Sequence, residues 1–254
     1  MTGPLRVPAL ALTLLTAASM FGMSPTVATH SDGAYDQPVW FTWGSRTLDA
    51  IIIPSDHGPI FNGGGVLGGG DPVAEANPCT NSYTRAMRQS ALDWKAAVAA
   101  FGPSWLQTGL TINVHVLGCD GVPSPPGMLA DPEILVIADE NKAVILGVTF
   151  SSNPCLILNS KMFVTSFTYN DMYNVAGHEF GHCLGLDHVS QEHPDADILD
   201  ATVDEPIGST ANPRHCPSNL NVNTMQGVFA GTLGQPGAGV AGSVSTGAYA
   251  QVAC

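Results

Sequence analysis

The chain has 254 residues, 44% of them hydrophobic, which suffices for the core of one domain of ordinary size. Its formal net charge is −13, from 21 acidic and 8 basic residues. Because nucleic acids are polyanions and the sequence contains no basic stripe, this balance argues against a nucleic-acid partner. Acidity also suits Ca²⁺, although no calcium-loop pattern is present, so calcium stays a subordinate alternative.

Residues 1–28 predict a secretory signal peptide. Arg6 provides its positive start, a short apolar stretch follows, and small residues ending at Ala28 provide a cleavage site. An uncleaved membrane anchor, the alternative, would need a longer apolar run. We therefore expect a secreted, extracellular protein without a membrane span after cleavage, in which residues 29–254 form a single domain that acts as a monomer.

Residues 29–80 are predicted to be largely irregular, with one strand candidate at Leu48–Pro54. A glycine-rich run at residues 63–70 has the composition of a phosphate-binding loop. It lacks the Lys-Ser/Thr ending of such a loop and no helix pattern follows it directly, so we interpret it as a flexible loop.

The first helix is predicted over residues 82–101, where apolar residues recur at spacings of three and four and form one core-facing stripe. The stripe consists of Met87, Ala91, Trp94, Val98 and Phe101. Gly102-Pro103 ends this helix. Strands rich in Val, Ile and Leu follow, separated by clusters of turn-forming residues. They are predicted at Thr111–Leu117, Ile134–Ala138, Ala143–Phe150 and Cys155–Asn159.

A second long helix is predicted from about residue 170 to Leu184. Two glycines, Gly177 and Gly181, lie four residues apart on one flank of it. Each glycine costs up to about 1 kcal/mol of helix stability relative to alanine. Their spacing therefore predicts the close approach of another backbone, such as a strand.

The same helix carries the pattern H-E-x-x-H-x-x-G-x-x-H, beginning at His178. Residues four apart share a helix face, so His178 and His182 can reach one metal ion. Gly185 ends the helix where the chain must turn, because glycine enters left-handed geometry at little cost. The turn brings back His188 as a third ligand, and Glu179 can reach a water on the ion. Three histidines with an open fourth position are typical of a catalytic zinc site.

All six cysteines follow the predicted signal peptide, and an even number in a secreted chain predicts three disulfides. They are Cys79, Cys119, Cys155, Cys183, Cys216 and Cys254. Cys183 is expected to point away from the ligand face and to form a bridge. Among the open pairings we favour Cys183–Cys216, and a bridge at Cys254 would hold the C-terminal tail.

Acidic residues gather downstream of the motif. We interpret them as a solvated loop, with a cation site as the alternative. They are Asp195, Asp197, Asp200, Asp204 and Glu205. His193 and His215 also lie downstream, but neither fits the turn at Gly185, so we interpret both as surface residues.

The motif resembles that of the metzincin zinc endopeptidases. In that family a methionine in a tight turn lies beneath the zinc, downstream of the third histidine. Met225 is the only methionine after His188, and turn-forming residues surround it, so it is the candidate Met-turn residue. Val189, directly after the third histidine, does not match the marks of the better-known subfamilies. Gly227 stands where some metzincins have a tyrosine ligand, so no fifth ligand is expected.

The resemblance covers about residues 45–230 and implies an α+β fold. Its parts are a twisted, mostly parallel sheet with an edge strand over a cleft, two main helices and an irregular C-terminal part. It also implies that a protein or peptide substrate lies along the strand Ala143–Phe150. The family usually ends in a helix after the methionine, and the Gly-, Ala-, Ser- and Thr-rich residues 230–254 depart from that pattern.

The activity that the resemblance implies is zinc-dependent hydrolysis of peptide bonds by a secreted endopeptidase. One catalytic Zn²⁺ would be held by His178, His182 and His188, and Glu179 would act as general base toward the attacking water. The rival interpretation is a secreted zinc-binding or adhesive module without turnover. Glu179 favours the enzyme, since a binding module needs no general base there. Three histidines with an open position argue against a third alternative, a metal-free disulfide-rich domain.

Overall fold

The computed structural model describes residues 37–54, 77, 79–119, 132–139, 147–151, 154–160, 168–189, 197–200, 212–235 and 250–254. All of them belong to one unit of the chain, Gly33–Cys254. The predicted signal peptide and the glycine-rich run lie outside the described residues. The same holds for His193, Asp195, Asp204 and Glu205.

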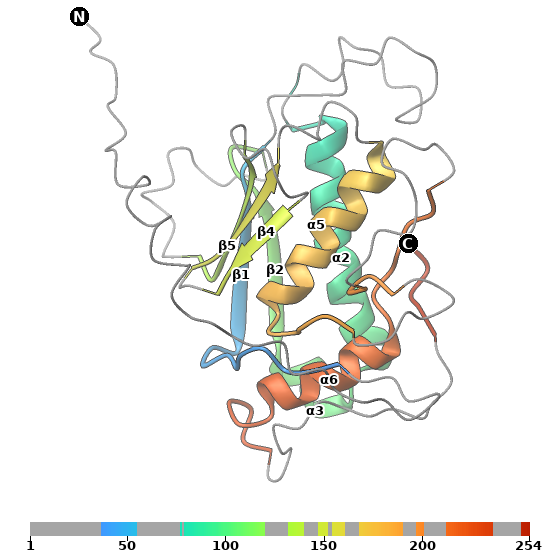
Figure 1. Ribbon diagram of the computed structural model, residues 1–254. Helices are drawn as coiled ribbons and strands as arrows, with labels where there is room; N and C mark the ends of the chain where they lie inside the picture. The colour runs from blue at the N-terminus through green and yellow to red at the C-terminus, as the bar shows by residue number, and fades with distance from the viewer. Residues whose placement is uncertain are drawn as a thin grey trace, which may run out of the picture. The chain divides into compact units, whose positions relative to one another are not determined.

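In the described part of the chain, five strands form one sheet in the order β2-β1-β3-β5-β4 (Figure 1). They are β1 (Thr47–Ile52), β2 (Thr111–Val116), β3 (Ile134–Asp139), β4 (Gly147–Phe150) and β5 (Cys155–Ser160). Neighbouring strands are parallel except β4, which runs antiparallel to β5 at the edge of the sheet. The predicted mixed fold with a mostly parallel sheet is confirmed, and every predicted strand is present.

Two long helices, α2 (Ser82–Phe101) and α5 (Tyr169–Cys183), pack side by side on one face of this sheet (Figure 1). Alternate residues of a strand point to the same face, and one such set is buried in β1, β3 and β5 and at two positions of β2. It comprises Leu48, Ala50, Ile52, Ile112, Val116, Ile134, Val136, Cys155 and Ile157. The largest helix side chains buried with them are Trp94, Tyr83, Tyr173 and Phe180. Helix α5 contacts β4 and β5, so it lies beside the edge of the sheet.

Helix α2 begins and ends where the sequence predicts. The side chain of Asn81 caps its start by accepting from two backbone N–H groups of the first turn. Gly102 ends it in an extended conformation. Pro103 then begins a short helix, α3 (Ser104–Gly109), which the sequence analysis did not anticipate. None of the described helices combines the length and the apolar character that a membrane crossing requires.

Helix α6 (Asn219–Phe229) replaces the turn that was predicted around Met225. Ser218 and Asn221 form a capping box at its start, in which each side chain accepts from the other's backbone N–H. Packing of a buried stripe at helical spacing overrides the turn preference of the neighbouring Asn, Thr and Gly residues. The stripe contains Val222, Met225 and Phe229. Met225 is therefore a core residue within a helix, and the prediction that it lies in a turn is wrong.

The three predicted disulfides are present, but one predicted pairing is wrong. The bridges are Cys79–Cys119, Cys155–Cys183 and Cys216–Cys254. Cys183 ends α5, which packs on β5, so it lies beside the first residue of that strand, Cys155, with 5.7 Å between the Cα atoms. Cys216 pairs instead with Cys254, which confirms that a bridge holds the end of the chain.

The glycines of α5 mark close contacts, as predicted, but with side chains rather than with a strand backbone. A Cβ on Gly177 would lie 2.6 Å from Ile198 Cδ1, and a Cβ on Gly181 would lie 2.6 Å from Trp94 Cζ2. Trp94 Nε1 also donates to the Gly177 carbonyl at 2.8 Å. The two glycines thus allow α2 and the segment 197–200 to pack directly on the backbone of α5.

Replacing Gly181 by alanine should destabilise the fold. Alanine gains about 1 kcal/mol of helix propensity, but overpacking against the buried indole costs about 1–3 kcal/mol. The new Cβ would also lie 2.8 Å from Leu199 Cδ2. Because two buried side chains meet the new Cβ, we expect a cost of about 2–3 kcal/mol, so that the free energy of unfolding, measured by urea denaturation, falls by about 1–2 kcal/mol net of the propensity gain.

Gly231→Ala is the matched control, because a Cβ at that position meets no atom within 4 Å. It should leave the free energy of unfolding within about 0.5 kcal/mol of the wild-type value. A Gly181→Ala protein as stable as this control would contradict the close packing of α5 on α2.

Candidate metal centre

Helix α5 starts at a capping box. The Thr168 side chain accepts from the Asp171 N–H, and the Asp171 side chain accepts from the Thr168 N–H. Asn212 Nδ2 donates to the same Asp171 carboxyl group at 2.6 Å. In the helix that begins there, residues four apart share one face. The ring centroids of His178 and His182 therefore lie only 4.6 Å apart.

The helix ends at a left-handed turn, as predicted. Gly185 has a φ of +91°, and a Cβ on it would lie 2.5 Å from the Phe41 carbonyl oxygen, so both the backbone and the space require glycine. The Gly185 N–H donates to the His182 carbonyl at 2.9 Å, and the Leu186 N–H donates back to the last helical turn at 3.2 Å. This pair of bonds is a Schellman motif, and it turns the chain toward His188.

Residues 37–43 run beside this turn and hold its backbone. The Trp40 N–H donates to the Gly185 carbonyl at 2.8 Å. Gln37 Nε2 donates to the Asp187 carbonyl at 2.9 Å, from a side chain that is fully buried. Two carbonyls of the turn that follows the helix are therefore satisfied by a segment about 150 residues away in sequence.

Aromatic side chains of the same segment border the centre. The Trp40 indole contacts the His182 ring edge to face, with 5.6 Å between centroids, and is 40% exposed. Trp43 Nε1 donates to the Cys183 carbonyl at 2.9 Å. The part of the chain that sequence analysis described as irregular thus forms one wall of the site.

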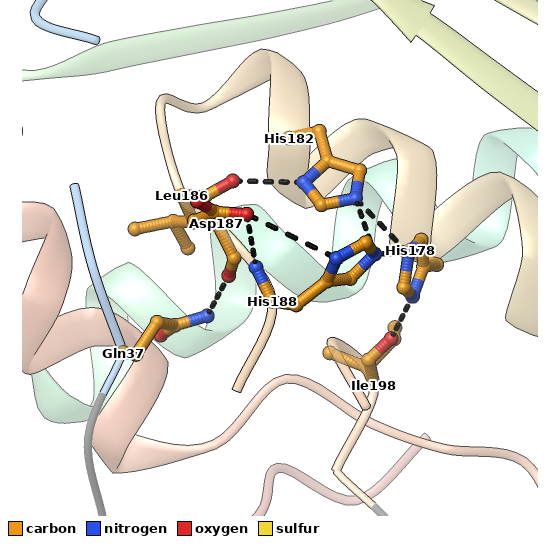
Figure 2. Close-up of polar contacts among 7 residues, drawn as sticks. All are labelled: Gln37, His178, His182, Leu186, Asp187, His188 and Ile198. Carbon is orange, nitrogen blue, oxygen red and sulfur yellow. Dashed lines mark hydrogen bonds and ion pairs between the residues drawn. The ribbon is translucent and has the colours of Figure 1, made fainter. Parts of the chain in front are cut away.

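The three predicted histidine ligands meet at one point (Figure 2). The Nε2 atoms of His178 and His182 lie 3.0 Å apart, and His188 Nε2 lies 3.1 Å from the first and 3.2 Å from the second. Among the described residues, this is the one group of His, Cys, Asp or Glu side chains that could hold a metal ion. Metal–nitrogen bonds of about 2.0–2.1 Å in a tetrahedron separate the nitrogens by roughly 3.3 Å, so the spacing fits such an ion.

The hydrogen bonds of the rings direct their metal-binding nitrogens inward. His178 Nδ1 lies 2.9 Å from the Ile198 carbonyl, and His182 Nδ1 lies 2.8 Å from the Leu186 carbonyl (Figure 2). A carbonyl only accepts, so each Nδ1 carries the proton and each neutral ring presents an Nε2 lone pair. Two such lone pairs 3.0 Å apart repel one another unless a cation lies between them. The donor set therefore fits a metal ion, with backbone carbonyls orienting two of its ligands.

Burial keeps these rings neutral. It lowers the pKa of His178 to about 3, with help from His182 and His188, while the bond to the Ile198 carbonyl acts in the opposite direction. Burial also lowers the pKa of His182. A neutral imidazole is the form that binds a metal, so both rings are ready to act as ligands at physiological pH.

Glu179 follows the first histidine on α5 and is 7% exposed. Its Oε2 accepts a 2.6 Å hydrogen bond from Thr149 Oγ1, on the edge strand β4. Burial raises the pKa of Glu179 to about 7, and the bond from Thr149 opposes that shift. A carboxyl group that titrates near neutrality can both accept and return a proton, as a general base and acid must.

Other predicted residues do not belong to the histidine group. Met225 is buried within α6, and the backbone N–H of His215 donates to Asn174 Oδ1. Asp197 and Asp200 are only 3% and 9% exposed, so the interpretation of the acidic cluster as a solvated loop is wrong for these two residues.

Three residues at the centre were missed by sequence reasoning. Thr149 lies in the predicted edge strand, but a lone threonine carries no sign of its partner on α5. Ile198 acts through its backbone carbonyl, which no side-chain pattern reveals. Gln37 lies in a segment without periodicity, so only the fold shows that it reaches Asp187.

We expect the purified protein to bind one divalent metal ion per chain, and His182→Ala to lose it. Even changes to residues that only orient metal ligands cost about 10–100-fold in affinity, so loss of a ligand should cost more than about 100-fold. Metal content after dialysis and a competition titration with a chelator measure this. His115→Ala, on β2 and outside the histidine group, is the control; equal metal content in both variants would contradict the site.

In the metal-free protein, ionisation of the buried Glu179 carboxyl group should lower the stability of the fold as the pH rises. Glu179→Gln should abolish this effect. The folded pKa of about 7 exceeds the ordinary value of 4.5, so between these values the folded state keeps a proton that the unfolded chain releases. Wild-type stability should therefore fall relative to the variant as the pH rises from 4.5 to 7, by about 3 kcal/mol in total, and the gap should stay constant above that.

Urea denaturation of both proteins with a chelator present, from pH 4.5 to 8, measures this gap. Taking the difference between the two proteins cancels the titration of the histidines. A gap that does not change with pH would show that burial leaves the pKa of Glu179 at its ordinary value.

Comparison with known proteins adds no relative to this picture. No family model matches the chain, and no curated protein matches it in sequence. The functional interpretation of the centre therefore rests on the chemistry of His178, His182, His188 and Glu179.

Proposed function

We propose that the protein is a secreted zinc endopeptidase with a metzincin-like catalytic domain. The observation that carries the proposal is the convergence of three histidine Nε2 atoms, with a buried, hydrogen-bonded glutamate on the same helix. Neutral imidazoles suit zinc, and three of them leave the fourth position of a tetrahedral site open, as catalytic zinc sites do.

The residues of the centre support hydrolysis of an amide. Zinc, when bound, supplies Lewis acidity for the reaction. Glu179 accepts the proton of the water that attacks the peptide carbonyl and returns it to the leaving amine. Thr149 keeps one oxygen of that carboxyl group in place through its 2.6 Å bond. No residue of the chain needs to become covalently attached to the substrate.

The edge strand supports a peptide as substrate. Strand β4 ends the sheet, and an extended peptide can add to such an edge through main-chain hydrogen bonds that are largely independent of sequence. Thr149, on this strand, touches Glu179, so a peptide aligned with β4 would pass the general base. A protein or peptide substrate therefore fits the arrangement better than a compact small molecule.

One family feature differs in this chain. The turn that contacts the ligand helix is Asp197–Asp200, which supplies the Ile198 carbonyl to His178 and contains no methionine. The proposal thus depends on the histidines and Glu179 and not on a Met-turn. Secretion is supported by the pairing of all six cysteines in disulfides, which persist in oxidising compartments.

The purified protein supplied with Zn²⁺ should hydrolyse an unfolded protein such as casein, and a chelator should stop it. Glu179→Gln should lower kcat by at least about 100-fold while the metal stays bound, because proton transfer is lost and the ligands are kept. Release of soluble peptides and metal content are measured on the same samples.

Glu133→Gln is the matched control. It makes the same chemical change in a carboxyl group that accepts from the Asp49 N–H in the sheet, and it should retain full activity. A protein that holds one zinc per chain and cleaves no peptide would instead support the binding module without turnover.

A further inference from the structure

A buried carboxyl group, that of Asp197, stands next to the centre without being part of it. Its Oδ1 accepts from the Leu199 N–H at 2.9 Å and from Asn221 Nδ2 at 3.0 Å, and its Oδ2 accepts from Ser218 Oγ at 3.1 Å. The residue is 3% exposed. Burial of a polar group costs free energy unless the group is hydrogen-bonded. These bonds therefore stabilise the buried carboxyl group and fix its position relative to its neighbours.

One role is to shape the turn that carries the Ile198 carbonyl. The Asp197 side chain accepts from Leu199 and its backbone carbonyl accepts from the Asp200 N–H at 3.0 Å, which closes the turn around Ile198. The Ile198 carbonyl is the group that lies 2.9 Å from His178 Nδ1. The position of this carbonyl, and with it the orientation of the first ligand ring, thus depends on Asp197.

The same group also reaches the third ligand. Asn221 Nδ2 lies 3.3 Å from Gln37 Oε1, and Gln37 Nε2 donates to the Asp187 carbonyl, directly before His188 (Figure 2). Asp197, Asn221 and Gln37 are all buried. One continuous polar network therefore links the carbonyl that orients His178 to the backbone that carries His188.

We propose that Asp197 is a positioning residue of the metal centre. Its carboxyl group holds the Ile198 carbonyl on His178 and, through Asn221 and Gln37, the chain at His188. The inference rests on the proposed metal site and adds a residue that does not touch the metal. Partners that orient metal ligands in this way typically contribute about 10–100-fold to metal affinity.

Two substitutions at Asp197 test the role in the full-length protein. Asp197→Ala removes the bonds from Leu199, Asn221 and Ser218 and should weaken Zn²⁺ binding, measured by chelator competition, by about 10–100-fold. Asp197→Asn keeps an oxygen that can accept from Leu199 and Asn221, so it should recover most of the affinity. If Asp197 only filled space, Asp197→Asn would not bind Zn²⁺ more tightly than Asp197→Ala.

A second readout does not involve the metal. In the metal-free wild-type protein the His178 Nδ1 proton, bonded to the Ile198 carbonyl, should give a slowly exchanging NMR signal. Asp197→Ala should lose or shift this signal, and Asp197→Asn should retain it.

Asp93→Ala is the matched control. Asp93 is 5% exposed, and its side chain accepts from Tyr173 Oη at 2.7 Å and from Gln89 Nε2 at 2.9 Å, between α2 and α5. The variant should lose stability, as any change to a buried polar pair does, while zinc affinity and the His178 signal stay as in the wild type.

These experiments test the proposed metal site and the proposed role of Asp197 separately. If wild-type protein binds no Zn²⁺, the metal site is wrong, and the His178 signal of the metal-free variants still decides the role of Asp197. A folded Asp197→Ala protein with wild-type affinity and an unchanged signal would overturn that role.

If Asp197→Ala does not fold, Asn221→Ala tests the role instead, because it removes the side chain that donates to Asp197 and lies next to Gln37. Reduced affinity is then the expected result, and wild-type affinity the contrary one.

Discussion

The left-handed turn at Gly185 is the constraint on which the whole centre depends. Two histidines on one face of a helix can share an ion, but they approach it from the same side. A third ligand has to come from another direction, and the chain must reverse at once to supply it. The φ of +91° and the nearby Phe41 carbonyl leave room for glycine alone at this point.

Three other parts of the chain support the centre. Residues 37–43 lie against the turn, residues 197–200 contact α5 at its glycines, and β4 brings Thr149 to Glu179. The bonds from residues 37–43 to the turn and the contact of the Ile198 carbonyl with His178 involve backbone groups, whose positions the fold determines. The three histidine rings and Glu179 are therefore oriented by rigid elements of the protein, which is the arrangement that a precise site requires.

The sequence was most informative where chemistry and periodicity coincide. The apolar stripe of α2 and the histidine spacing of α5 predicted both helices closely, because they depend on local geometry. The ligand set His178, His182 and His188 followed from the same spacing plus one glycine.

The predictions that were wrong, and the residues that were missed, depend on tertiary packing. Helix α6 forms because its apolar face is buried and Ser218 caps it, although its Asn, Thr and Gly residues favour turns. The partner of Cys183 depends on how α5 lies on β5, which the sequence does not state. The same applies to Thr149 and Asp197, whose partners on α5 and α6 are chosen by tertiary packing.

The contact of residues 37–43 with the ligand turn has a consequence for how the molecule matures. Gln37 meets Asp187 across 150 residues and Asn221 across 184 residues, so these bonds close very long loops of the chain. Closing a long loop costs entropy before any contact offsets it, and such pairings are therefore slow to form. We therefore expect residues 37–43 to reach their place after α5 and α6 have docked, which would complete the site late in folding. A nascent or partly folded chain would carry all its histidines and still lack the assembled centre.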